Sequence, residues 1–191
     1  MTRFAALALS AALLSAPAFA EAQKYTLDPS HSTIVFSYTH LGFSTSFGMF
    51  GGINGEIQFD QENPAASSVT ASFPVKSMFT GWQARFDHIM SKDFFDATDD
   101  EMISFTSTGI EVTGEKTAKI TGDLTVNGIT KSVVLDAVLN QTGMHPMENK
   151  EWAGFSATTT LLRSDYKVDM FAPYVSDELT VQISVEAVKA D

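Results

Sequence analysis

The four histidines of the chain, His31, His40, His88 and His145, are its first candidates for chemistry. None lies four residues from another, so the paired-histidine spacing that holds zinc on one helix face is missing from the sequence. His31 and His40 flank one expected strand and His88 lies in an expected helix, so these three could meet in the fold. A metal site of this kind needs a further rigidly held ligand. We predict no metal site, with the three-histidine site as the alternative.

An acidic run at 93–101 is the second candidate for chemistry. Oxygen ligands suit calcium, but Phe94 and Phe95 interrupt the run and the EF-hand spacing is missing, so a solvated loop is predicted. The sequence has no cysteine, which excludes thiol catalysis and thiolate metal sites. It also has no Gly-x-Ser-x-Gly elbow and no P-loop. We therefore predict no catalytic residue and no cofactor.

Phenylalanine gives the strongest positive signal. The chain has fifteen, and seven gather in two clusters: Phe43, Phe47 and Phe50, then Phe79, Phe86, Phe94 and Phe95. Any one of these rings could simply be core. As a group they lie mostly in expected loops and in the expected helix, outside the faces of strands. Rings in such positions commonly line or gate an apolar cavity at the mouth of a small barrel.

The elements that position these rings alternate apolar and polar residues, which is the period of half-buried strands. Strands are expected near 24–28, 32–41, 50–60, 67–75, 102–112, 117–126, 129–140, 151–163 and 179–187. Asn127-Gly128 between two such runs predicts a tight hairpin. Only 82–90 has helical spacing, with Phe86, Ile89 and Met90 on one face.

These elements predict an all-β fold: one antiparallel, lipocalin-like β-barrel of about eight or nine strands, with one short helix near one mouth. Glycines inside expected strands, such as Gly122 and Gly154, favour strongly bent barrel strands over the alternative, a sandwich.

Residues 1–20 have the features of a cleaved secretory leader: Arg3, an apolar stretch at 4–14, and the small-x-small site Ala18-Phe19-Ala20. We expect a mature chain of one domain, 21–191, exported to the periplasm or secreted, and not anchored in a membrane. The formal net charge is −11 and becomes −12 when Arg3 is removed. Such an acidic protein is not expected to bind nucleic acid.

Several segments resemble the YceI-like family in order along the mature chain. They are YTLDPSHS at 25–32, VFS at 35–37 with His40, GMF at 48–50, GEIQFD at 55–60, RFDHIMSKDFFD at 85–96, GDLTVNGITK at 122–131 and RSDY at 163–166. Two positions depart from the family pattern: Lys167 stands where Gly is common, and Glu101-Met102 stand where a Tyr-Pro pair is common.

The resemblance implies a lipocalin-like barrel that holds a polyisoprenoid or a similar amphiphile, such as an isoprenoid quinone or its precursor, as a carrier, scavenger or storage protein. It also implies that a homodimer could form. The expected ligand contacts are Phe36, Tyr38, His40, Phe43, Phe47, Phe50, Trp82, Arg85, Phe86, His88, Phe94, Phe95, Phe105, Leu124, Phe155 and Arg163.

Among these contacts, Arg85, His88 and Arg163 are expected to hold the polar end of the ligand or to fix the mouth of the barrel. An internal ion pair with Asp87 or Asp93 is the alternative role for such an arginine. The alternative function is an enzyme, an isomerase or hydrolase acting on a bound amphiphile through His40, His88 and Arg85.

Overall fold

The computed structural model describes residues 21–191. Its strands are β1 Gln23–Leu27, β2 Thr33–His40, β3 Ser44–Phe50, β4 Asn54–Phe59, β5 Ser68–Pro74, β6 Met102–Val112, β7 Thr117–Val126, β8 Ile129–Met144, β9 Glu151–Leu162 and β10 Glu178–Lys189. Its helices are α1 Gln83–Met90 and the 3₁₀ turns η1 Pro64–Ala66, η2 Val75–Ser77 and η3 Arg163–Tyr166. The leader expected at 1–20 lies outside the described residues.

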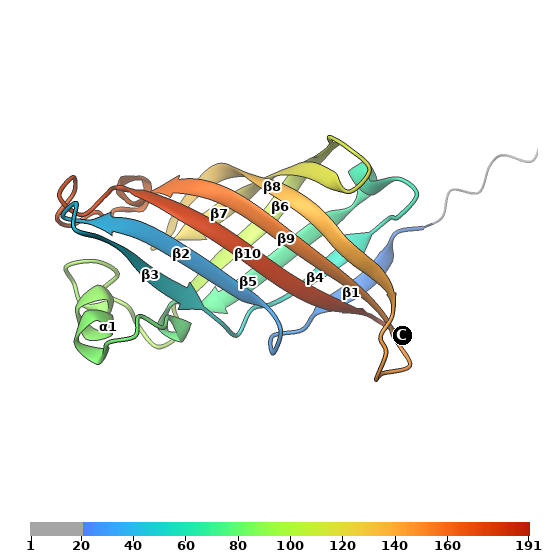
Figure 1. Cartoon of the computed structure of the whole chain (residues 1–191), viewed down its shortest axis with the longest axis horizontal. Helices are drawn as coiled ribbons and strands as arrows, with labels where there is room; N and C mark the ends of the chain where they lie inside the picture. Colours follow the sequence, from blue (N-terminus) through green and yellow to red (C-terminus); the bar gives the residue numbers. More distant parts are fainter. Residues whose placement is uncertain (1–20) are drawn as a thin grey trace, which may run out of the picture.

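The strands form one antiparallel sheet that closes on itself (Figure 1). Neighbours follow the order β1-β4-β5-β6-β7-β8-β9-β10, and β1 pairs with β10 to complete an eight-stranded barrel. The edge of β10 that pairs with β1 also pairs with β2, farther along the strand, and β3 continues the sheet from β2. The predicted all-β antiparallel barrel with one short helix is therefore confirmed.

The structure has two strands, β3 and β4, where the sequence predicted one strand at 50–60 preceded by a loop. The strand expected at 50–60 is β4 and begins only at Asn54, because the chain turns at Gly51 and Gly52 and Gly52 has a φ of +65°. A positive φ is strained for residues with a side chain, so glycine permits this break. Residues 44–50, which carry Phe47 and Phe50, are therefore strand and not loop.

The barrel wall is completed at one end by the segment between β5 and β6. One edge of β3 has no partner strand among the described elements, but Met49 and Phe79 exchange backbone hydrogen bonds of 3.0 and 2.7 Å. Val75 N–H donates to the carbonyl of Glu101 at 2.9 Å and closes the base of the segment. Helix α1 consequently lies beside β3 at the same end of the barrel (Figure 1).

The hairpin predicted at Asn127-Gly128 is confirmed, with φ values of +50° and +68°. Lys167, one of the two departures from the family pattern, also has a left-handed backbone, with a φ of +56°. It ends η3 in a conformation that glycine would accept without strain.

Candidate functional site

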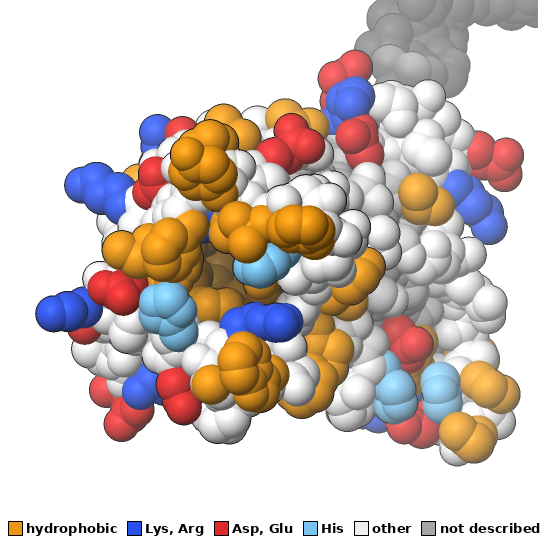
Figure 2. Space-filling model, turned by 60° about the vertical axis from the view of Figure 1, so that its left-hand side comes forward, with side chains coloured by type: hydrophobic (Ala, Val, Ile, Leu, Met, Phe, Trp, Pro, Cys, Tyr) orange, Lys and Arg blue, Asp and Glu red, His pale blue; other side chains and the backbone are white. Residues whose placement is uncertain are grey.

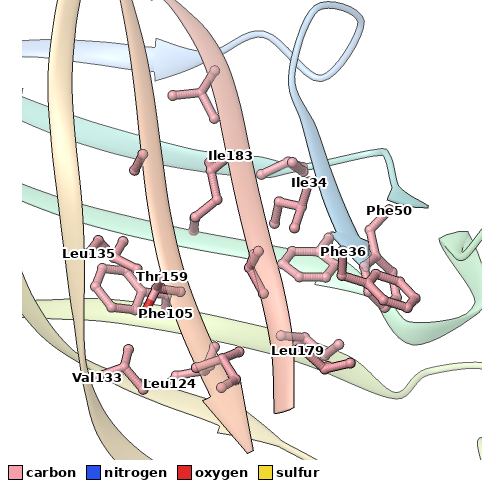
Figure 3. A pocket seen from close by; sticks show the side chains of 18 of the residues that line it. Ile34, Phe36, Phe50, Phe105, Leu124, Val133, Leu135, Thr159, Leu179 and Ile183 are labelled. Atoms are coloured by element: carbon pink, nitrogen blue, oxygen red, sulfur yellow. The ribbon is translucent and has the colours of Figure 1, made fainter. Parts of the chain in front are cut away.

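An apolar cavity of about 800 Å³ runs through the interior of the barrel. Its walls are the inward faces of the long strands, because alternate residues of a strand point to one side of a sheet. On β10 these residues are Leu179, Val181, Ile183 and Val185. From Leu179 to Val185 there are six residue steps of strand, or roughly 20 Å at ~3.3 Å per residue. Figure 3 shows side chains of β2, β8, β9 and β10 pointing into one shared space.

Two glycines let aromatic rings lie flat against the cavity wall. A side chain at Gly48 would collide with the ring of Phe36, and one at Gly122 would collide with the ring of Phe105. Phe36 also packs on Phe50, with ring centroids 5.5 Å apart. These close approaches keep the rings at the wall and leave the centre of the barrel open.

The cavity reaches the end of the barrel where α1 lies. His40, Arg85 and His88 line it there, together with Phe94 and Phe171. The His88 ring contacts Phe94 and Phe171 edge-on, at centroid distances of 5.2 and 6.0 Å. Figure 2 shows hydrophobic, histidine and basic side chains around a hollow at this end. We call this opening the mouth.

The polar groups of the mouth are held in different ways. Nε2 of His88 lies 3.2 Å from a carboxylate oxygen of Asp93, within an exposed pair. Arg85 is half-buried and donates one hydrogen bond of 3.2 Å, to the carbonyl of Thr80. Within residues 21–191 Arg85 takes part in no ion pair, so most of its donors are available to a ligand.

Arg163 is buried, with only 8% of the residue exposed, and its donors are used within the chain. Its guanidinium donates to the carbonyls of Ser176, Val168, Met170 and Val175 at 2.8, 2.9, 3.3 and 2.8 Å. Burial lowers the pKa of Arg163, although nearby carboxylates act in the opposite direction. An arginine stays charged even so, and here it fixes the loop 164–177 at the mouth.

Neither acid expected to pair with an arginine does so. Asp93 contacts His88, and Asp87 accepts a hydrogen bond of 2.8 Å from Gln83. The expected ion-pair alternative is therefore wrong for both arginines. Because backbone carbonyls already solvate the buried charge of Arg163, a partner carboxylate is unnecessary.

Charge is distributed unevenly over the cavity wall. The basic and histidine side chains at the mouth are His40, Arg85, His88 and Arg163, and no acidic residue lines the cavity there. The single lining carboxylate, Glu115, belongs to the β6–β7 turn, where Lys116 also lines the cavity. The lining of the mouth is therefore locally basic, whereas the acidic side chains of the run at 93–101 lie outside that lining, next to α1.

The described residues show neither a metal centre nor a spanning helix. Within 21–191, no group of three or more His, Asp or Glu side chains is arranged so that it could hold a metal ion. His31 instead lies 2.5 Å from a carboxylate oxygen of Asp28. No helix in the described part of the chain is long and apolar enough to cross a membrane.

Comparison with known proteins identifies the family. The family model described as a YceI-like domain matches residues 25–187. The chain belongs to the YceI-like family. A UPF0312 protein of Pseudomonas savastanoi is 40% identical over 187 residues, which are 97% of this chain and 96% of that protein.

Two solved structures share the fold. The Campylobacter jejuni YCEI protein is 30% identical, with a TM-score of 0.71 over 80% of this chain and 90% of that one. A polyisoprenoid binding domain from Saccharophagus degradans has a TM-score of 0.67 at 12% identity, over 87% of this chain and 98% of that one. The likeness to this second structure shows the fold alone.

In this YceI-like chain, most of the residues expected to contact a ligand do line the cavity. They are Phe36, Tyr38, His40, Phe50, Trp82, Arg85, His88, Phe94, Phe95, Phe105, Leu124, Phe155 and Arg163. Three do not. Phe43 is 90% exposed in the β2–β3 turn, Phe47 is 60% exposed on β3, and Phe86 packs against the hydrophobic core.

The predicted contacts were mostly aromatic, and much of the cavity wall is not. Aliphatic side chains of β7, β8 and β10 make up a large part of the lining: Ala118, Ile120, Val126, Val133, Leu135, Ala137, Leu139, Leu179, Val181, Ile183 and Val185. Their signal was the strict alternation of those three runs, which marks an inward face. Alternation does not distinguish a packed interior from a hollow one, so these residues were not predicted as contacts.

Proposed function

We propose that this protein binds a polyisoprenoid or a similar long-chain amphiphile in the barrel cavity, and acts as its carrier, scavenger or storage protein. The cavity carries the proposal, because about 800 Å³ of space lies behind hydrocarbon side chains. Side chains fill the interior of many small barrels, whereas this interior is hollow. Its volume lies within the range of ligand pockets, ~300–1,000 Å³.

Chain burial alone supplies the affinity that such a ligand needs. Each isoprene unit has five carbons, so its transfer from water into the cavity contributes about 4 kcal/mol at ~0.8 kcal/mol per carbon. Ordering of the chain and loss of translational freedom oppose this gain. A few buried units still suffice for tight binding without any covalent chemistry. The proposal agrees with a solved protein of the same fold, the polyisoprenoid binding domain from Saccharophagus degradans.

We place the polar end of the ligand at Arg85. This side chain lines the mouth, has one hydrogen bond to the chain, and belongs to the locally basic part of the wall. A guanidinium suits phosphate, carboxylate or quinone oxygens. Arg163 is the weaker candidate, because its bonds to four carbonyls leave few donors free.

We propose binding without catalysis. In the described chain, neither His40 nor His88 is hydrogen-bonded to a hydroxyl group that could serve as a nucleophile. His88 contacts Asp93, which orients its ring at the mouth. The geometry therefore favours binding over the isomerase or hydrolase considered as the alternative.

We further propose that the protein acts outside the cytoplasm, in the periplasm or as a secreted protein. The leader features of residues 1–20 support this location. Intact-mass analysis of the exported protein should give a mature N-terminus at Glu21. A mass that retains the leader would contradict the proposed release.

The test of the binding function is organic extraction of the purified protein, followed by mass spectrometry. We expect a long-chain isoprenoid in the extract, and uptake of solanesol, a long polyprenol, by delipidated protein in detergent solution. Leu135→Trp places an indole in the cavity and should reduce both. Val134→Trp is the matched control, because the neighbouring Val134 is 44% exposed and does not line the cavity. Empty extracts together with no solanesol uptake would refute the proposal.

A further inference from the structure

Large hydrophobic side chains are exposed around the mouth on three separate segments. We define the rim as Leu41, Phe43, Phe79, Trp82, Phe171 and Tyr174, which are 49%, 90%, 63%, 64%, 53% and 74% exposed. Monomeric soluble proteins rarely expose large contiguous apolar patches, and such patches usually mark a binding surface. We therefore infer that the rim is covered by a binding partner when the protein functions.

Contacts along the chain show that the rim encircles the mouth. Leu41 N–H donates to the carbonyl of Tyr174 at 2.9 Å, which joins the β2–β3 turn to the loop 164–177. In that loop, Phe171 packs on His88 of α1, at a centroid distance of 6.0 Å.

The remaining rim residues, Trp82 and Phe79, lie along the chain between the sheet and α1. Trp82 immediately precedes α1 and also lines the cavity. Phe79, three residues earlier, pairs with Met49 of β3, five residues of strand (~17 Å at ~3.3 Å per residue) from Ser44 at the β2–β3 turn, so the rim extends along the outer edge of β3. Figure 2 shows hydrophobic side chains on several sides of the hollow at this end. Whatever covers the rim therefore also covers the entrance to the cavity.

We propose that the rim docks the mouth onto a zwitterionic lipid bilayer, so that the ligand passes between bilayer and cavity without crossing water. The inference rests on the proposed lipid-binding function. An apolar chain that leaves the cavity needs an apolar phase in contact with the mouth, because exposure of its carbons to water is unfavourable. A bilayer supplies that phase directly.

The composition of the rim fits a bilayer interface. Trp and Tyr concentrate at the level of the lipid headgroups, because each combines an apolar ring with a polar group. Trp82 and Tyr174 lie among apolar neighbours in this way, and Phe43 at the tip of the β2–β3 turn is the most exposed of the six. Such side chains enter the interface without any spanning segment.

The charge of the protein determines which kind of surface can bind the rim. The acidic run at 93–101 follows α1 directly, and the whole chain has a net charge of −11. A strongly anionic membrane would repel both. A second copy docked mouth to mouth would bring two acidic runs together and block the path of the ligand. A zwitterionic surface, such as phosphatidylcholine or phosphatidylethanolamine, avoids both conflicts.

The experiment measures partition of the purified protein onto phosphatidylcholine vesicles by co-sedimentation. Phe43→Ser combined with Phe79→Ser should weaken partition at least tenfold, because each ring that moves from water to an apolar phase contributes roughly a factor of ten or more. Met144→Ser combined with Met147→Ser is the matched control. Met144 and Met147 are 60% and 88% exposed on and beside the β8–β9 hairpin, away from the rim, and their loss should leave partition unchanged.

Two further readouts connect docking with ligand exchange. Brominated phosphatidylcholine should quench the fluorescence of Trp82, and Trp82→Phe should remove most of that quenching, because the other tryptophan, Trp152, is only partly exposed, in β9. Uptake of solanesol from vesicles should slow at least tenfold in the Phe43/Phe79 variant. Uptake from detergent solution should stay unchanged in the same variant, which separates docking from cavity binding.

The outcomes distinguish the two proposals. Wild-type protein that binds solanesol in detergent but does not partition onto vesicles would overturn docking and leave the binding function intact. A dimeric wild type together with a monomeric Phe43/Phe79 variant would overturn membrane docking and show that a second copy covers the rim. Uptake from vesicles that requires an added protein would overturn it in favour of a protein partner. Partition onto vesicles without any solanesol uptake would overturn the exchange role.

Discussion

Replacement of Arg163 by methionine is the sharpest test of how the mouth is built. The change keeps most of the hydrocarbon stem and removes the guanidinium that donates four hydrogen bonds to loop carbonyls. Each bond contributes about 1 kcal/mol net, and the longest, at 3.3 Å, contributes less. We therefore expect the free energy of unfolding to fall by about 3–4 kcal/mol. Since small domains have only ~5–15 kcal/mol, that loss is large.

Arg85→Met is the matched control for this prediction. Its guanidinium donates one hydrogen bond, to Thr80, so its loss should cost less than about 1 kcal/mol. It should instead reduce binding of a polar-headed isoprenoid more than binding of a plain hydrocarbon chain of the same length. We thus expect Arg163→Met to reduce mainly the stability of the fold and Arg85→Met to reduce mainly ligand recognition.

The assay for both variants is equilibrium unfolding of delipidated protein in urea, with amide hydrogen exchange as a second readout. Local opening of the loop would appear as faster exchange at 168–176 even where global unfolding changes little. An Arg163→Met protein that loses less than about 1 kcal/mol and keeps wild-type exchange in the loop would refute the structural role. Equal losses for Arg163→Met and Arg85→Met would also contradict it.

Two other predictions concern the barrel itself. Hydrogen bonds from Lys189 and then Tyr25 lower the pKa of Glu151 below its usual value of 4.5, so this carboxylate stabilises the fold above that pH and loses its contribution as pH falls through the lowered pKa. Urea unfolding should show Glu151→Gln less stable than wild type at pH 7, with a difference that shrinks progressively as the pH falls below 4.5; a constant difference would contradict the assignment. Gly122→Ala should lose about 1–3 kcal/mol by thermal unfolding, because the new methyl meets the Phe105 ring and the carbonyl oxygen of Thr106. Gly109→Ala has open space and should be neutral or slightly stabilising, so equal losses at both sites would rule out the ring contact as the cause.

Local features of the sequence determined the elements. Alternation at Leu179, Val181 and Ile183 marks one face of β10 wherever that strand lies, and these residues do face inward. Asn127-Gly128 fixes a hairpin, because both residues accept a positive φ. Spacing over 82–90 predicts α1, which spans Gln83–Met90. In each case neighbours in the sequence supply the whole signal.

Tertiary structure decided which aromatic rings face the cavity. Phe47 and Phe50 belong to the same sequence cluster, yet three residues along a strand is an odd step, so they point to opposite sides. That distinction needs the strand boundaries, which depend on the turn at Gly51 and Gly52. Phe43, at the tip of the β2–β3 turn, is exposed for a reason of its own: nothing in the described chain covers the tip.

Tertiary structure also decided that the interior is hollow and that Arg163 binds the carbonyls of a loop. Strand alternation gives an inward face, but barrel width follows from how many strands close the ring and how they tilt. Closure depends on the pairing of β1 with β10, which lie at opposite ends of the chain. The carbonyls that solvate Arg163 belong to the loop between β9 and β10, and only the folded loop brings them around the guanidinium. The sequence by itself therefore determined a barrel of alternating strands with aromatic clusters, and long-range pairing turned it into a cavity with a mouth.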